Sequence, residues 1–316
     1  MSAKPTIVSG KRTPKVLRQF MAYRPLLLML LIPFVYIVIF SYLPMGGVVL
    51  AFKDYKVRDG IFGSPWIGLK NFSFFFISGA AGRVVRNTLL YNITFIVVGM
   101  FTEVAFAILL SEIAGKYFKK LTQSFMLLPF FISWVVAASI VYNVFSFEYG
   151  LMNNILRALK LDPINLYAIT GAWPFLLLFF KLWKSTGYGC IIYLANITSI
   201  DQQIYEAADI DGASIWQKVT HITIQHLRPT MIIMLLLAMG NMFRGDFGMF
   251  YQIIRNNGLL LPTTDIIDTF VFRTLISSSD FGMSAAAGLF QSILGFATIM
   301  TANFIVNKID PDYALF

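Results

Sequence analysis

Charged residues are scarce in this chain. Only 13% of its 316 residues are Asp, Glu, Lys or Arg, whereas a soluble domain carries about 25%. Hydrophobic residues make up 57%, and Phe alone contributes 31 residues. Such a chain cannot cover a soluble surface with polar groups, so we expect lipid to be its main solvent. Because apolar segments recur from end to end, we interpret the chain as one membrane domain.

Cysteine and histidine are nearly absent too. Cys190 is the single cysteine, which excludes an intramolecular disulfide and a site built from several cysteines. His221 and His226 are the only histidines, and no third ligand lies near them in the sequence to complete a zinc site. The sequence also lacks a Gly-x-x-x-x-Gly-Lys-Ser/Thr phosphate loop and a paired-carboxylate or nucleophile–base arrangement. We therefore predict no catalytic residues, no metal and no cofactor.

The positive net charge of +9 has a local source. Residues 1–24 contain no acid, and their basic residues are Lys4, Lys11, Arg12, Lys15, Arg18 and Arg24. This flank is typical of the cytoplasmic side of a first membrane helix. We interpret 1–24 as a basic cytoplasmic segment. No basic soluble face with interleaved aromatic residues is found, which argues against nucleic acid as a partner.

Six segments are long and apolar enough to cross a bilayer, which takes about 20 residues. They cover roughly 25–44, 86–112, 122–146, 170–196, 230–253 and 284–307. The sequence thus predicts an all-α membrane protein with six transmembrane helices in a domain at 25–310, followed by a short tail at 311–316. An even number of crossings places both termini in the cytoplasm. The lysine-rich connection at 113–121 agrees with that orientation.

The stretch at 197–229 is amphipathic and is expected not to span the membrane. It is typical of two short helices joined at Gly212, because glycine permits the left-handed backbone that such a joint needs. Good helix formers occupy the first helix, at Glu206, Ala207 and Ala208. Ala213 keeps the joint small, so a partner surface could approach closely. The alternative is an ordinary amphipathic helix at the membrane interface.

The spacing in this stretch resembles the cytoplasmic signature loop of permeases in bacterial ATP-binding-cassette importers. Glu206-Ala207-Ala208 is followed after three residues by Gly212, and after nine more by Ile222. The family usually has a Leu-Pro pair two residues further on, where this chain has Ile224-Gln225. That departure bears on where the second short helix ends.

Other segments are similar to the sugar-permease branch of the same family. They are Trp183-Lys184, Gly187, Tyr193-Leu194-Ala195, Asp265-Ile266-Ile267-Asp268-Thr269 and Phe272-Arg273. The end of the chain, from Lys308 to Phe316, resembles the complex-oligosaccharide permeases called the LplB type. The resemblance covers nearly the whole chain.

The resemblance implies the type I importer fold, also called MetI-like, in a bacterial cytoplasmic membrane. Two permeases would form a pseudo-symmetric pair, here a heterodimer, above a cytoplasmic ATPase dimer. An extracytoplasmic solute-binding protein would deliver the sugar. ATP hydrolysis would belong to the separate ATPase, and each signature loop would dock in a groove on it. The coupling residues implied here are Glu206, Ala207, Ala208, Asp211, Gly212 and Ala213.

The fifth apolar segment carries a polar stripe. At about 100° per residue, one narrow arc contains Asn241, Arg244, Gly245, Gly248, Gln252 and Arg255. One interpretation is a wall of the translocation cavity, and the other is hydrogen bonding between helices. We predict the substrate pathway at Asn241, Arg244, Gly248 and Gln252. Asp246 lies off the arc, where it either pairs with a cation or marks a break in the helix.

Two further patterns lie within apolar segments. Lys181 and Lys184 share one side of the fourth segment, and a structural ion pair with Glu103 is favoured over sugar contact. Small residues on one face of the sixth segment predict close helix packing, at Ser284, Gly288, Ser292 and Gly295.

These patterns predict a permease subunit that forms half of the pathway for a sugar or oligosaccharide. The arginines of the polar stripe would suit sugars that contain uronate. A non-sugar cargo for the same class of transporter is the main alternative. An intramembrane enzyme or a receptor is more remote, because neither explains the joint at Gly212.

Overall fold

The structure is a computed structural model that describes residues 23–77 and 79–314. The basic residues from Lys4 to Arg18, and Leu315 and Phe316 of the tail, lie outside the described residues. The regular elements in the described part are helices, with one isolated bridge between Lys53 and Trp66. The chain divides into two units, Met1–Val49 and Leu50–Phe316. The all-α prediction is confirmed.

The described part of the first unit is one long apolar helix. It consists of α2 (Arg24–Ile37), a π-helical turn at Val38–Tyr42 and α3 (Leu43–Met45), and a 3₁₀ segment at Gly46–Phe52 leads into the second unit. Together they make a candidate span of 29 residues at Arg24–Phe52, which confirms the first predicted span. Pro33 lies inside α2, as membrane helices tolerate.

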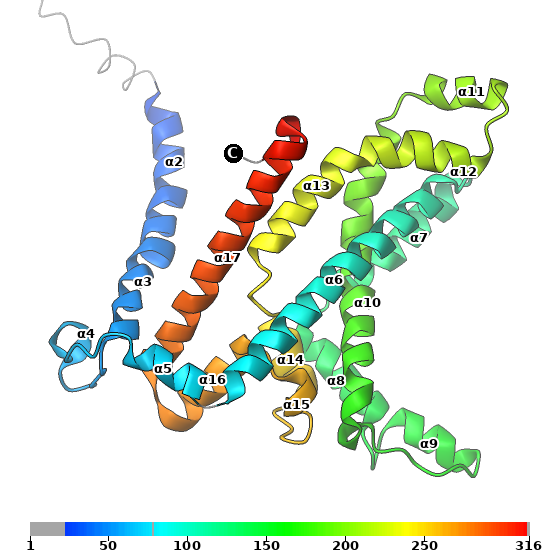
Figure 1. Cartoon of the computed structure of the whole chain (residues 1–316). Helices are drawn as coiled ribbons and strands as arrows, with labels where there is room; N and C mark the ends of the chain where they lie inside the picture. The colour runs from blue at the N-terminus through cyan, green and yellow to red at the C-terminus, as the bar shows by residue number, and fades with distance from the viewer. Residues whose placement is uncertain (1–22, 78, 315–316) are drawn as a thin grey trace, which may run out of the picture. The chain divides into compact units, whose positions relative to one another are not determined.

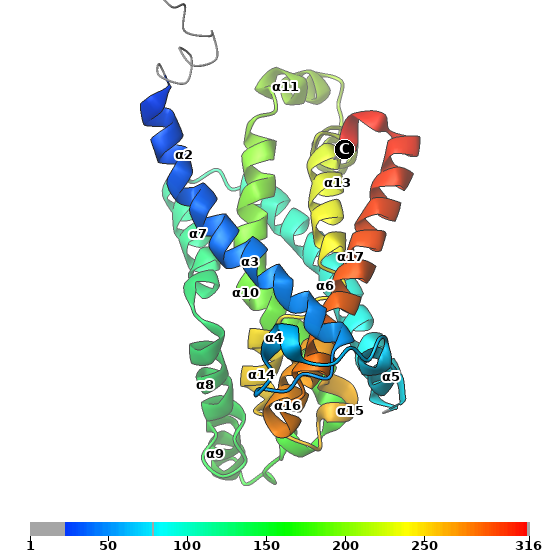
Figure 2. The ribbon, with the colours of Figure 1, turned by 90° about the vertical axis from the view of Figure 1, so that its left-hand side faces the viewer.

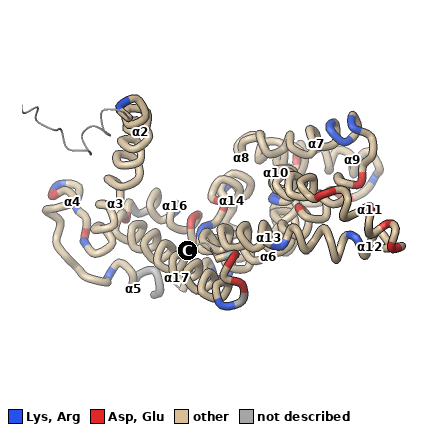
Figure 3. Tube along the Cα trace, turned by 90° about the horizontal axis from the view of Figure 1, so that it is seen from above, with Lys and Arg blue, Asp and Glu red and all other residues tan. Residues whose placement is uncertain are grey.

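The second unit contains the remaining helices (Figure 1). They are α4 (Gly60–Gly63), α5 (Lys70–Ile77), α6 (Ala80–Ser111), α7 (Lys116–Phe131), α8 (Trp134–Phe145), α9 (Leu151–Ala158), α10 (Trp173–Thr198), α11 (Gln202–Ile210), α12 (Ile215–Lys218), α13 (Ile224–Gly240), α14 (Phe247–Ile254), α15 (Leu261–Thr264), α16 (Ile267–Ser278) and α17 (Phe281–Ile309). Helices α6, α10 and α17 confirm the second, fourth and sixth spans. Most of the helical tube in this unit carries no charge (Figure 3).

The third predicted span is not one straight helix. Helices α7 and α8 meet at 96° across Ile132 and Ser133. Pro129 lies in the last turn of α7, and Ser133 begins α8 by accepting a hydrogen bond from the Val136 amide. The Lys184 ammonium of α10 donates to the carbonyls of Pro129, Phe130 and Ile132. Those carbonyls are therefore satisfied without a continuing helix.

The fifth span lies earlier in the chain than the predicted 230–253. It runs over Ile215–Gly240, through α12, a π-helical turn at Val219–Thr223 and α13. The expectation that 197–229 cannot span is therefore wrong for its second half, where Pro229 is accommodated inside α13. After Gly240 the chain leaves the helix until Asp246 caps α14 by accepting from the Met249 amide. The predicted polar arc is thus not one continuous helical face.

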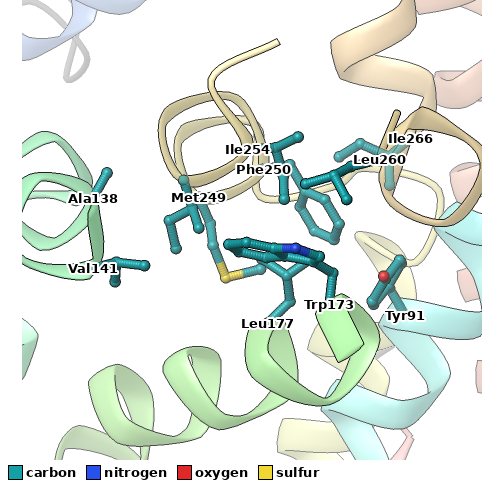
Figure 4. Packing of buried hydrophobic residues seen from close by; sticks show 11 residues of the cluster. Tyr91, Ala138, Val141, Trp173, Leu177, Met249, Phe250, Ile254, Leu260 and Ile266 are labelled. Carbon is teal, nitrogen blue, oxygen red and sulfur yellow. The ribbon is translucent and has the colours of Figure 1, made fainter. Parts of the chain in front are cut away.

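The largest apolar cluster joins α6, α8, α10 and α14. Figure 4 shows the indole of Trp173 within it, surrounded by Tyr91, Leu177, Met249 and Phe250. Trp173 is fully buried, and its indole N–H donates to the Leu166 carbonyl at 2.9 Å. Tyr167 packs beside this cluster, and burial raises its pKa to about 12. Its hydroxyl donates to the Ile253 carbonyl at 3.3 Å.

Glycines on α10 and α17 allow close helix packing. A side chain at Gly187 would overlap the backbone of α7 at Met126, and one at Gly189 would overlap the carboxylate of Glu103 on α6. A Cβ at Gly295 of α17 would lie 3.0 Å from the carbonyl oxygen of Gly240. The predicted small-residue packing of the sixth span is therefore seen at this position, where α17 meets the end of α13.

Candidate substrate pathway and coupling site

A cavity of about 590 Å³ lies between α6, α10, α13 and the segment Asn241–Phe247. This volume falls in the usual range for small-molecule sites, about 300–1,000 Å³. Its polar lining is unusual for the interior of a membrane bundle. The lining includes Asn92, Glu103, Lys181, Ser185, Asn241, Arg244 and Asp246.

The non-helical segment Asn241–Asp246 forms one side of this cavity, and neighbouring helices hold its backbone. Gln291 of α17 donates to the Phe243 carbonyl at 2.9 Å. Asn92 of α6 donates to the Arg244 carbonyl at 3.1 Å. The amide of Gly245 donates to the Asp268 carboxylate of α16 at 2.7 Å. Three consecutive residues are therefore fixed by three different helices, which replaces the hydrogen bonds that a continuous helix would have supplied.

The side chain of Asp246 ties this segment to two more helices. One carboxylate oxygen accepts from the Lys181 ammonium of α10 and from the Trp134 indole of α8, both at 3.0 Å. The other caps α14. The expectation that Asp246 pairs with a cation or marks a break is met on both counts. Glu103, proposed above as the partner of Lys181, does not form that ion pair in the described chain.

The four predicted pathway residues are placed differently. Asn241 and Arg244 line the cavity. Gly248 and Gln252 lie on α14, and neither is among the residues that line the cavity. A Cβ at Gly248 would come within 3.0 Å of Trp134, so this glycine allows α14 to pack against α8. The role of all four in transport stays a prediction.

Sequence reasoning missed Asn92 as a lining residue. A polar amide within an otherwise apolar helix was the available signal. The bond from Asn92 to the Arg244 carbonyl joins residues 152 positions apart, so the sequence alone did not reveal it.

The joint at Gly212 lies at the opposite end of the second unit from α9 and α15, as both side views show (Figures 1 and 2). Gly212 has φ +74°, and a Cβ built there would have open space around it. Helix α11 carries Glu206, Ala207 and Ala208, and Asp211 is its C-cap. Ser214 and Gln217 form a capping box that starts α12 just after Ala213. The first short helix and the left-handed joint are therefore confirmed, whereas the second helix is not short, because α12 continues into the fifth span at Ile215–Gly240.

Two large apolar side chains beside this joint are exposed among polar ones. Ile210 is 88% exposed and Trp216 is 73% exposed. Exposed large apolar residues that gather beside polar ones are typical of a protein contact surface. One exposed ion pair, Lys218 with Asp209 at 2.6 Å, links the two helices. The joint between α11 and α12 therefore forms a protruding surface that a partner protein could bind.

Comparison with known proteins decides the family. Residues 96–312 match the model described as "Binding-protein-dependent transport system inner membrane component". The chain belongs to this family. It is 34% identical over 287 residues to protein LplB of Bacillus subtilis (strain 168), covering 90% of each chain. It is 31% identical over 304 residues to the polygalacturonan/rhamnogalacturonan transport system permease protein YteP of the same organism, covering 96% of this chain and 94% of YteP.

A solved structure agrees with this result. The chain superposes with a TM-score of 0.84 and 28% identity on a chain of a bacterial ABC transporter involved in the import of the acidic polysaccharide alginate. The match covers 94% of this protein and 100% of that chain. This protein is thus a multi-pass inner-membrane permease of a binding-protein-dependent ABC importer, and not its ATPase. The family resemblance and the MetI-like fold are confirmed.

Proposed function

We propose that this permease forms half of the pathway for an oligosaccharide, including oligosaccharides that contain uronate. The observation that carries the proposal is the cavity of about 590 Å³ inside the spanning helices, whose lining includes charged and amide side chains. Sugars offer many hydroxyls and few apolar faces, so amide and charged side chains suit them. The names of YteP and of the alginate transporter, which refer to acidic polysaccharides, support the same class of cargo.

The proposed partners follow from the joint at Gly212. An ATPase dimer would receive the exposed surface that includes Glu206, Asp211 and Gly212. A second permease would complete the pathway as a heterodimer in the bilayer, and an extracytoplasmic binding protein would deliver the sugar. In both side views the end of α17 lies at the α11 end of the second unit, which supports a cytoplasmic C-terminus (Figures 1 and 2). Labelling cysteines placed at Ser2 and Leu315 from each side of the membrane checks both termini.

The test is uptake by the complete transporter in proteoliposomes. The permease is reconstituted with its partner permease, ATPase and binding protein, and labelled oligosaccharides are offered outside with ATP inside. We expect ATP-dependent accumulation of at least one oligosaccharide and none of amino acids or short peptides. Uptake of a peptide or amino acid without any sugar would favour the alternative cargo and would refute the sugar assignment.

A further inference from the structure

The four charged side chains that line the cavity are not equivalent. They are Glu103, Lys181, Arg244 and Asp246. Lys181 and Asp246 neutralise each other in an ion pair at 3.0 Å. The carboxylate of Glu103 lies against Gly189, where α6 meets α10. Arg244 belongs to none of the ion pairs found among residues 23–77 and 79–314.

Asp268 of α16, which binds the neighbouring Gly245 amide, does not form an ion pair with Arg244. The field of Asp268 does reach Arg244. One oxygen of Asp268 already accepts from the Gly245 amide at 2.7 Å and from Gln291 at 3.1 Å. Arg244 is exposed to the cavity, so its guanidinium retains donors for a ligand.

The backbone that carries Arg244 is unusually fixed for a non-helical segment. The bonds from Gln291 and Asn92 and to Asp268 hold residues 243, 244 and 245, and the side chain of Asp246 holds the next position. A cation on a rigid frame binds with a smaller loss of conformational entropy than one on a mobile loop. An unpaired arginine inside a membrane domain is costly unless something compensates for its charge. Arg244 is thus a cation on a fixed backbone with no ion-pair partner among the residues that the structure describes, an arrangement that suits an anionic ligand.

We propose that Arg244 binds the carboxylate of an acidic sugar unit in the cavity, and that it determines the charge selectivity of transport. This inference rests on the proposed function. A guanidinium matches a carboxylate with two parallel hydrogen bonds, which an ammonium cannot form. Lys181 does not serve in this role because Asp246 already neutralises it. Asn241, at the start of the same segment, supplies an amide for neighbouring hydroxyls.

The experiment compares one oligosaccharide in two forms in the reconstituted complex. An oligogalacturonide and its carboxyl-reduced, neutral derivative are offered to the wild-type complex and to the Arg244→Gln, Arg244→Lys and Arg86→Gln variants. Arg86 is an exposed arginine outside the cavity lining, so its variant is the matched control. ATPase stimulation by the binding protein shows that each complex is assembled.

We expect Arg244→Gln to lower uptake of the acidic form by about tenfold to a hundredfold, from the lost charged hydrogen bonds. Uptake of the neutral form should stay within about twofold, since no bond to a carboxylate is lost. Arg244→Lys should fall between, and Arg86→Gln should match wild type. Equal losses for both sugars, or no loss for either, would overturn the role of Arg244. Import of neutral sugars but not of the oligogalacturonide by the wild-type complex would also overturn the role of Arg244, whereas import of no sugar at all by the assembled complex would overturn the proposed function.

Discussion

Two interruptions of regular helix in this protein look similar in sequence and differ in structure. Both contain one glycine and one acidic residue, at Asp211–Ser214 and at Asn241–Asp246. The interruption at Asn241–Asp246 is held by side chains from α6, α8, α10, α16 and α17. The interruption at Gly212 is held chiefly by its own flanking helices, through the Asp209–Lys218 pair and the Ser214–Gln217 capping box. Glycine therefore has a different purpose in each.

Glycine is required at one position for its backbone conformation and at the other for close packing. Gly212 has a positive φ with open space around it, so only the backbone requires glycine there. Gly245 does not have a positive φ, but a Cβ there would collide with Ile266 and lie 3.2 Å from the Asp268 carboxylate. The conformation of Asn241–Asp246 is thus determined by the helices packed around it. The conformation of the Gly212 joint is determined by its own residues, which leaves its surface free for a partner.

The largest effect is expected for Gly212→Leu, measured as sugar uptake by the reconstituted complex. A side chain with φ near +74° costs about 1–2 kcal/mol, and the leucine would project where the ATPase is proposed to dock. We expect uptake to fall by about tenfold or more, with ATP hydrolysis no longer stimulated by the loaded binding protein. Folding and delivery of sugar should remain intact.

Gly212→Asn is the matched control for this variant. Asparagine adopts the left-handed conformation more readily than leucine and is smaller, so it should retain much more uptake. Glu206→Lys should impair coupling without a change at the joint itself. Normal uptake by the Gly212→Leu protein would remove the coupling role from this loop.

A middle-sized effect is expected when the acid that pairs with a lysine is removed, at Asp246 in one interruption and at Asp209 beside the other. Asp246→Ala deprives Lys181 and Trp134 of their partner and α14 of its cap. We expect the free energy of unfolding to drop by about 2 kcal/mol, because both partners of this ion pair are only partly exposed. Asp209→Ala should cost about 0.5 kcal/mol or less, because the Asp209 side chain is 58% exposed.

Thermal unfolding of the purified permease in detergent compares the two alanine variants. Adding Lys181→Met to Asp246→Ala should recover part of the loss, because no unpaired cation remains. Equal destabilisation by Asp246→Ala and Asp209→Ala would mean that the two interruptions are held equally, contrary to the contacts described above.

The smallest effect is expected for the amides that support each segment. Gln291→Leu removes the bonds to the Phe243 carbonyl and to Asp268, and should destabilise the protein by about 1 kcal/mol. Gln217→Leu removes only the exposed capping box, with an expected loss of about 0.5 kcal/mol. The same unfolding measurement orders the two. A larger loss of stability for Gln217→Leu than for Gln291→Leu would contradict the conclusion that Asn241–Asp246 is the more firmly held segment.

The straight spans could be predicted from composition because their pattern is local. Helices α6, α10 and α17 are long apolar runs, and the lack of water in the bilayer core favours a helix, which satisfies its own backbone hydrogen bonds. The joint at Gly212 was also predictable, since it depends on glycine and on adjacent helix formers. What the joint contacts in the assembled transporter remains a prediction from the family resemblance.

The bent and broken spans could not be predicted because their causes are distant in sequence. The end of α7 is satisfied by Lys184, which lies 52 to 55 positions away from the carbonyls it binds. The segment around Arg244 depends on Asn92, which lies 152 positions away. Periodicity at 100° per residue assumes a continuous helix, so it grouped Gln252 with Arg244 across a break. Arg244 and Asn241 were found because polar residues in a span are informative in any backbone conformation.

The length of α6 exceeds the thickness of the hydrocarbon layer of a bilayer. Its 32 residues extend about 48 Å, whereas the hydrocarbon layer is about 30 Å thick. The charged residues near its ends, Arg86 and Glu112, are about 39 Å apart along the axis, so reaching both interfaces requires a tilt of about 40°. We therefore expect α6 to cross the bilayer at a steep tilt, so that the acyl-chain length of the surrounding lipid bears on its angle.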